Sequence, residues 1–260
     1  MMSALRTAAT GMLAQQTNVD VLSNNIANLN TTSFKRQKAA FRDLVYQTPI
    51  GVGAITSNNG TTTPTGAQIG LGVNVGAVYK IMEQGNMTQT ENTFDVGIQG
   101  RGFFRITLPD GTNAYTRDGS FNVDNTGTLV TKEGYAVDPN IVIPEDALQI
   151  TISDLGVVSA KVGEQVVNLG QMQVTMFINE AGLENIGGNY YKETDTSGVG
   201  IAGDPGIDGA GSLLQGFLES SNVDPITAVT DLITAQRAYE LNSRVISTAD
   251  EMLNSVNQIR

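Results

Sequence analysis

The sequence predicts an α+β protein in which two terminal helices pair as an antiparallel coiled coil, with an extended segment and a compact β-domain inserted between them. Apolar residues recur every seven positions at both ends of the 260-residue chain, a period typical of coiled coils. Residues 44–79 carry no charge, and residues 95–190 hold short β-type runs separated by Gly and Asp turns. These patterns divide the chain into 1–32, 33–94, 95–215 and 216–260.

Residues 1–32 are predicted to form the first heptad helix. Gly11 lies inside it and costs about 1 kcal/mol relative to Ala, so this helix is weak on its own. Asn30 and Thr31 are residues that stop a helix. The positions assigned to its apolar seam are Leu5, Met12, Val19, Leu22, Ile26 and Leu29.

Residues 216–260 are predicted to contain the second heptad helix. Asp224 followed by Pro225 is an N-cap with proline at the first helical position. Asn242 is a polar residue on the seam, and a buried amide there fixes register and partner number at a cost in stability. The positions assigned to this seam are Leu232, Ala235, Tyr239, Asn242, Ile246, Ala249, Leu253 and Val256.

The uncharged stretch 44–79 is rich in Gly, Thr, Ser and Asn. Such a composition indicates either a loose linker or extended backbone held by neighbours. Its lack of charge favours extended backbone. The domain 95–215 that follows is predicted to be β-rich, with strands at 103–108, 114–116, 148–152, 157–162, 166–169 and 173–178.

Composition excludes several classes of function. The chain has no Cys and no His, which removes the commonest transition-metal ligands and every imidazole-dependent triad. It has 15 basic and 26 acidic residues, a balance that argues against broad binding of nucleic acid or anionic lipid. Composition therefore argues against a transition-metal site and against nucleic acid as a partner. We also expect no cofactor and no small-molecule substrate.

Two local motifs have ordinary structural explanations. The spacing from Asn122 to Gly127 loosely matches a calcium loop, but its flanks are strands, which favours a hairpin turn. Arg101, Phe103, Phe104 and Arg105 resemble a platform for stacking nucleic-acid bases. The acidic surroundings favour alternating core residues of a strand instead.

The two seams lie at opposite ends of the chain. If they pair within one molecule, a two-helix hairpin still leaves much apolar surface unburied, and identical neighbours would be needed to cover it. The sequence therefore predicts assembly, with the helices marginal or disordered in the free monomer.

The segment after the first helix carries the most specific signal. As an ordinary helix end, it places the basic residues Lys35, Arg36, Lys38 and Arg42 favourably for the helix dipole. That interpretation leaves unexplained why the heptad helix ends there. The pattern runs through Ala27, Asn28, Asn30, Thr31, Phe34 and Lys35.

This pattern resembles the hallmark of the bacterial flagellar rod and hook proteins, the axial family. Ser33 stands where that family usually has Gly; if the Gly serves a positive φ, Ser33 is strained or the turn differs. The stretches 221–224, 236–243 and 248–253 resemble the same family. Residues 100–104, 108–111 and 114–121 resemble its distal-rod members, as do Pro64, Gly66, Gln68, Gly70 and Gly72.

The resemblance implies a structural protein without enzymatic activity. Its helices would form an inner coiled-coil layer around a narrow export channel, with the β-domain as the outer layer. Copies would polymerise helically into a rigid hollow drive shaft of the basal body that crosses the periplasm and transmits motor torque to the hook. The segment 44–79, with the five residues from Pro64 to Gly72, would brace neighbouring subunits.

The resemblance also implies partners. These are further copies of the chain, proximal rod proteins, the hook protein, the surrounding P and L rings and the flagellar type III export apparatus. Export through that apparatus fits the lack of a readable cleaved signal peptide.

Three alternatives stay open. The resemblance also fits another axial protein of the proximal-rod or hook type. The residues alone leave an enzyme that uses Asp/Glu or Ser chemistry in the β-domain, or a soluble coiled-coil adaptor. An enzyme predicts activity in a monomer, and an adaptor predicts a discrete dimer or trimer.

Overall fold

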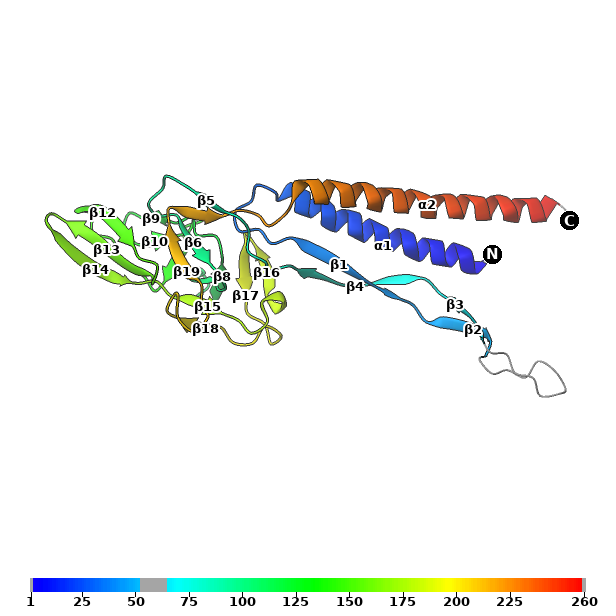
Figure 1. The fold of residues 1–260 in the computed structure, drawn as a ribbon, viewed down its shortest axis with the longest axis horizontal. Helices are drawn as coiled ribbons and strands as arrows, with labels where there is room; N and C mark the ends of the chain where they lie inside the picture. The colour runs from blue at the N-terminus through cyan, green and yellow to red at the C-terminus, as the bar shows by residue number, and fades with distance from the viewer. Residues whose placement is uncertain (1, 52–64, 259–260) are drawn as a thin grey trace. The chain divides into compact units, whose positions relative to one another are not determined.

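The computed structural model describes residues 2–51 and 65–258, which form two compact units (Figure 1). The helix–hairpin unit comprises residues 1–27, 37–80 and 224–260, and the β unit comprises residues 28–36 and 81–223. The β unit thus includes residues on both sides of the segment 95–215 assigned to the β-domain from sequence.

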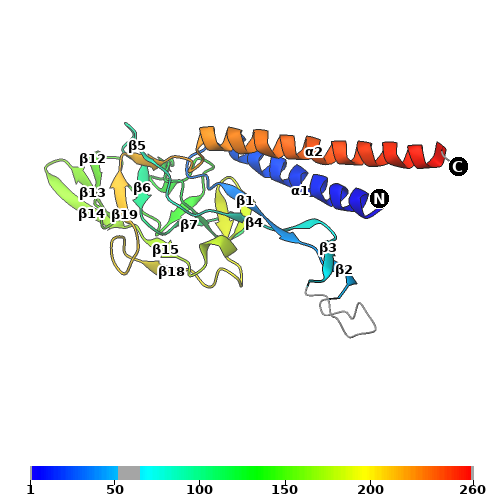
Figure 2. The ribbon, with the colours of Figure 1, turned by 45° about the vertical axis from the view of Figure 1, so that its right-hand side comes forward.

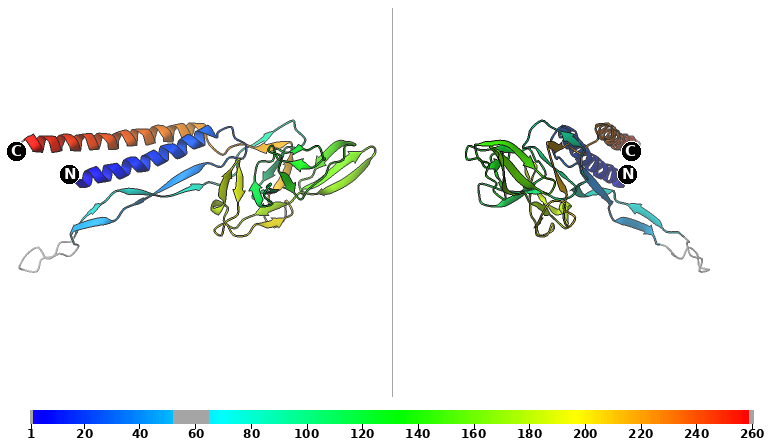
Figure 3. Two further views of the ribbon diagram at one scale, coloured as in Figure 1. Left: turned by 180° about the vertical axis from the view of Figure 1, so that it is seen from behind. Right: turned by 60° about the vertical axis from the view of Figure 1, so that its left-hand side comes forward.

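The helix–hairpin unit contains two long helices, α1 (Met2–Ala27) and α2 (Pro225–Gln258). They lie side by side and run in opposite directions, with both chain ends at the same end of the pair (Figures 1 and 3). The Asp224 side chain accepts a hydrogen bond from the Ile226 N–H at 3.0 Å, which confirms the predicted N-cap. The two helices and the strands between them confirm the α+β class.

An antiparallel hairpin completes this unit. Strand β1 (Gln37–Asp43) pairs with β4 (Val73–Lys80), and β2 (Tyr46–Ile50) pairs with β3 (Ala67–Gly70). The described parts of the uncharged stretch therefore consist largely of extended strands. Pro64 lies outside the described residues.

Antiparallel sheets build the β unit. In its described residues the largest sheet has the order β16-β17-β8-β7-β11-β10-β9. A second sheet has the order β12-β13-β14, and its three strands are labelled in Figure 2. Three two-stranded sheets, β19-β6, β20-β5 and β15-β18, complete it. The bounds are β5 (Met87–Gln89), β6 (Val96–Gln99), β7 (Phe104–Thr107), β8 (Asn113–Thr116), β9 (Asn122–Val123), β10 (Leu129–Val130), β11 (Ala136–Asp138), β12 (Ala147–Ile152), β13 (Val157–Val162), β14 (Gln165–Gln171), β15 (Val174–Met176), a 3₁₀ turn η1 (Glu180–Gly182), β16 (Glu184–Gly187), β17 (Tyr190–Lys192), β18 (Ile201–Gly203), β19 (Ser212–Gln215) and β20 (Phe217–Glu219).

The core of the β unit has two parts on either side of the start of β7. Phe104 packs edge-on against Phe121, with ring centroids 5.1 Å apart, inside the larger apolar cluster. Its neighbour Phe103 packs against Phe177 and Tyr191 in a smaller cluster. Both phenylalanines are completely buried, which supports core strand residues and excludes an exposed stacking platform.

The loop from Asp124 to Gly127 is a turn, as predicted. The Gly127 N–H donates to the Asp124 carbonyl at 2.9 Å, and β9 pairs with β10 across it. Within the described residues, neither helix has a stretch long and apolar enough to cross a membrane. The same residues contain no group of three or more acidic, His or Cys side chains placed to hold a metal ion.

Candidate assembly site

One face of α2 is turned inward along the helix. The least exposed residues recur every three or four positions, as a helix face requires. Tyr239, which was assigned to the seam, is 42% exposed, whereas the adjacent Ala238 is half-buried. The side chain of Val256 lies outside the described residues. The buried or half-buried residues of this face are Ala228, Leu232, Ala235, Ala238, Asn242, Ile246, Ala249 and Leu253.

The opposite side of α2 is also apolar, but it is exposed. At about 100° per residue, the exposed Ile226 and Ile233 fall roughly opposite the inward face. The exposed Leu241, Val245 and Met252 lie to one side of it. A helix that is apolar on both sides is typical of one buried in a larger structure. The exposed large apolar residues of α2 are Ile226, Val229, Ile233, Tyr239, Leu241, Val245 and Met252.

The first helix approaches α2 closely at Gly11. A Cβ atom at this position would lie 3.0 Å from Asn242 Nδ2 and 3.2 Å from Asn242 Cγ. The glycine that weakens α1 therefore makes room for the polar seam residue of α2. Further along, Val19 and Tyr239 line a groove of about 520 Å³ on this unit.

A second face of α1 contacts the β1–β4 hairpin. Asn25 donates from Nδ2 to the Gln37 carbonyl and accepts from the Gln37 N–H at Oδ1, both at 2.8 Å. The most buried residues of α1 are Ala8, Ala14, Val21 and Asn25. The predicted seam residues Leu5, Met12, Val19, Leu22 and Ile26 are half-buried, as is Leu29, which follows the helix in the β unit.

The bracing residues lie in and beside the hairpin. Gly72 has φ +125°, and a Cβ there would lie 2.1 Å from Thr10 Oγ1 of α1. Only glycine fits this position without moving the helix or the hairpin. Gly66 precedes β3, Gln68 lies exposed within β3, and Gly70 ends it.

The motif after α1 belongs to the β unit from Asn28 onward. Ser33 is 2% exposed and has φ +56°, so the positive φ expected of the family glycine is present here with a serine. Its hydroxyl donates to the Arg117 carbonyl at 2.8 Å, and its N–H donates to the Glu219 carbonyl at 2.8 Å. These bonds offset the cost of the left-handed conformation. In the rest of the motif, Ala27 and Asn30 are exposed, and Asn28, Thr31 and Phe34 are half-buried.

Lys35 ends the motif in a buried ion-pair cluster. Its Nζ lies 2.6 Å from Glu219 Oε1 and donates to the Glu83 carbonyl at 2.7 Å. The other carboxylate oxygen of Glu219 accepts from Arg117 Nε at 2.8 Å. The Gly85 N–H also donates to Glu219 Oε1 at 2.7 Å. The three charged side chains are almost completely buried, so Lys35 is a core residue and not part of a solvated basic cluster.

Burial and pairing oppose each other in this cluster. Burial alone would raise the pKa of Glu219, but Arg117, Lys35 and the Gly85 N–H offset it and hold that pKa below its ordinary value. Burial, followed by the nearby Arg117 charge, lowers the pKa of Lys35. The Glu219 carboxylate is therefore paired with two buried cations, Lys35 and Arg117. Its removal would leave both charges buried without a partner.

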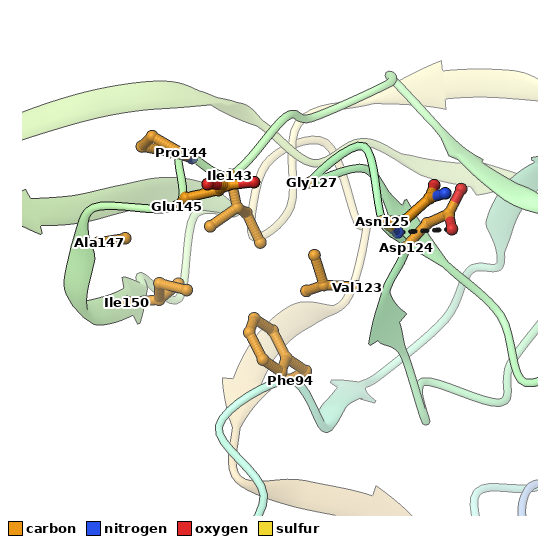
Figure 4. A pocket seen from close by; sticks show the side chains of 10 residues that line it. All are labelled: Phe94, Val123, Asp124, Asn125, Gly127, Ile143, Pro144, Glu145, Ala147 and Ile150. Carbon is orange, nitrogen blue, oxygen red and sulfur yellow. Dashed lines mark hydrogen bonds between the residues drawn. The ribbon is translucent and has the colours of Figure 1, made fainter.

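The β unit also has a shallow pocket of about 380 Å³ (Figure 4). Phe94, Val123 and Ile150 contribute apolar side chains, while Asp124 and Glu145 lie on opposite sides of it (Figure 4). General acid–base chemistry needs two carboxylates that converge on one substrate. This pocket does not bring these two together.

Comparisons with known proteins match three segments of the chain to flagellar families. Residues 5–35 match the family "Flagella basal body rod protein", residues 97–160 match "Flagellar hook protein FlgE/F/G D1 domain", and residues 214–259 match "Flagellar basal body rod FlgEFG protein C-terminal". The "Flagellar basal-body rod protein FlgG" of Caulobacter vibrioides is 52% identical over all of both chains. Its namesake in Borreliella burgdorferi is 50% identical over all of this chain and 99% of its own.

The chain belongs to the flagellar basal-body rod protein family. It is a structural subunit of the distal rod in the flagellar basal body. The family assembles with copies of itself and with other axial proteins of the flagellum.

Proposed function

We propose that the chain polymerises helically, through its terminal helices, into a rigid hollow shaft that transmits motor torque to the hook. The observation that carries this proposal is the apolar character of α2 on two opposite sides, of which one is left exposed. Copies of the chain that pack against the exposed side would bury it. Ile226, Val229 and Ile233 are among the residues that such packing would cover.

The inner layer of the shaft would be an antiparallel coiled coil of α1 and α2, and the residues assigned to the two seams would hold it together. The seam positions of α1 are only half-buried in the single chain, which supports this proposal. Helices of neighbouring copies could bury them completely. Asn242 beside Gly11 would set the register of the pair.

The hairpin would brace neighbouring subunits. It carries exposed apolar residues on strands that have few neighbours of their own, as at Tyr46, Ile50 and Ile69. Extended backbone wedged between copies resists twist better than a solvated linker. Of the residues assigned to bracing, Gly66, Gln68, Gly70 and Gly72 lie in or beside this element.

We further propose where this shaft lies and which proteins it contacts. It would cross the periplasm, meet proximal rod proteins and the hook protein at its two ends, turn inside the P and L rings and be exported through the flagellar type III apparatus. Its function would be mechanical and not enzymatic, because torque transmission needs many repeated contacts and no catalytic group.

Sedimentation of the purified chain, with and without residues 1–30, tests polymerisation. We expect the intact chain to form pelletable filaments above a threshold concentration and the truncated chain to remain in the supernatant. A discrete dimer or trimer at every concentration would instead indicate an adaptor. An active monomer that tolerates the truncation would indicate an enzyme.

A further inference from the structure

The chain passes between its two units four times, at 27/28, 36/37, 80/81 and 223/224. Each connection by itself has two soft dihedral angles per residue. Four independent connections would therefore make a compliant joint. On the β unit, however, the segments that bear these connections are bound to one another.

Asn222 binds two of these segments at once. Its Oδ1 accepts from the Arg36 N–H at 2.7 Å, and its Nδ2 donates to the Ile81 carbonyl at 2.9 Å and to the Glu83 carbonyl at 3.0 Å. Its own N–H donates to the Phe34 carbonyl at 3.3 Å. Asn222 lies one residue before the connection to α2. Its side chain therefore binds the end of segment 28–36 and the start of segment 81–85.

Backbone hydrogen bonds complete the junction. The Ile81 N–H donates to the Arg36 carbonyl at 2.9 Å, and the Ser33 N–H donates to the Glu219 carbonyl. Lys35 adds a buried link, since its Nζ contacts both Glu219 and the Glu83 carbonyl. The segments 28–36, 81–85 and 219–222 are therefore tied together pairwise.

We propose that Asn222 is a positioning residue that acts as a clasp, so that the four connections respond to twist as one body. This inference rests on the proposed mechanical function. Sliding of any one segment past the others would break hydrogen bonds to Asn222 before it moved a connection. The buried Lys35–Glu219 pair ties the same three segments together, because Lys35 also donates to the Glu83 carbonyl.

The isosteric variant Asn222→Asp separates the clasp from packing. It keeps the acceptor for the Arg36 N–H but replaces both donated bonds with a carboxylate facing the carbonyls of Ile81 and Glu83. Asn168→Asp is the matched control, because it makes the same change on an exposed strand of the same unit. There the side-chain oxygen accepts from the Gly170 N–H at 3.0 Å and remains an acceptor.

Hydrogen exchange of the purified full-length chain provides the first measurement. We expect the amides of segments 34–36 and 81–85 to exchange about tenfold faster or more in Asn222→Asp than in Asn168→Asp. The remainder of the β unit should exchange alike in both. Equal exchange in the two variants would overturn the proposal. Asn222→Ser, which is uncharged, replaces the aspartate variant if that one does not fold.

Rotation under load provides the second measurement, in cells whose rod protein is replaced by each variant. We expect Asn222→Asp to build rods in normal number, but to lose rotation speed more steeply than Asn168→Asp as medium viscosity rises. Equal speed at every viscosity would overturn the clasp. If the unaltered chain builds no rod, the proposed function fails, whereas the exchange result still decides whether the clasp exists.

Discussion

The β unit completely buries large side chains such as Phe104, Ile106 and Leu213, whereas the helix–hairpin unit buries mainly alanines. On α2 the buried residues are Ala228, Ala235 and Ala249, while the larger apolar residues are half-buried or exposed. Buried area sets the size of the hydrophobic driving force. The β unit thus has a core of its own, and the helix–hairpin unit must gain much of its stability from neighbouring copies.

The largest effect that this contrast predicts is loss of assembly on Ile246→Asp. The change places a carboxylate on the inward face of α2, where burial of an unpaired charge is very unfavourable. We expect no pelletable polymer, with the circular dichroism of the β unit unchanged. Ile178→Asp, at an exposed site of the β unit, is the control and should assemble. Normal assembly of Ile246→Asp would show that the predicted seam of α2 is not needed for polymerisation.

The ion-pair cluster predicts the next largest effect. Glu219→Gln leaves Lys35 and Arg117 buried without their carboxylate and should destabilise the β unit by about 3–5 kcal/mol. Denaturant unfolding measures this, with the exposed Glu184→Gln as the control. A cost below about 1 kcal/mol would show that the cluster does not hold the β unit together.

The same cluster predicts a dependence on pH. Because the folded state lowers the pKa of Glu219 below its ordinary value of 4.5, its contribution is present above that pH and is lost as the pH falls through the folded-state pKa. Unfolding curves between pH 3 and pH 7 should therefore show a loss of stability at the acid end that is smaller in Glu219→Gln. Identical pH profiles would contradict the assignment.

Substitution of one strand phenylalanine in each unit compares the stability that the two units gain from their own packing. Phe104→Ala empties a completely buried site in the β unit and should cost about 3–5 kcal/mol. Phe41→Ala in β1 removes a ring that is 40% exposed in the single chain, and it should cost the monomer under about 1 kcal/mol. Calorimetry of dilute protein measures both. Similar costs would contradict the difference between the units.

The smallest predicted effect is at Ser33. Ser33→Gly relieves the positive φ but loses the hydroxyl bond to Arg117, so the two changes partly cancel and the cost should stay within about 1 kcal/mol. Ser33→Ala keeps the strain and loses the bond, and it should cost more. The reverse order would mean that the hydroxyl does not support this turn.

The sequence predicted the elements better than their contacts. The seven-residue repeat of α2 marks an inward face that includes Leu232, Asn242 and Ile246. Tyr239 fits the same repeat, but in the single chain its ring is 42% exposed and lines the groove. The contact of α1 with the hairpin had no apolar signal, since it uses small residues and the amide of Asn25.

The buried cluster could not be predicted from local pattern. Lys35 and Glu219 are 184 residues apart, and a lysine beside Arg36 reads as part of a solvated basic run. Asn222 likewise reads as a polar residue ahead of a helix. Only the tertiary fold brings 28–36, 81–85 and 219–222 together, because their pairing depends on long-range contacts that no periodicity encodes.

Hydrogen exchange of the dilute monomer and of the polymer tests most directly whether the two units differ in this way. The account predicts that 2–27 and 225–258 exchange rapidly in the monomer and become protected on polymerisation, while 95–215 is protected in both states. Helices as protected as the β unit in a monomer that stays single at every concentration would contradict it.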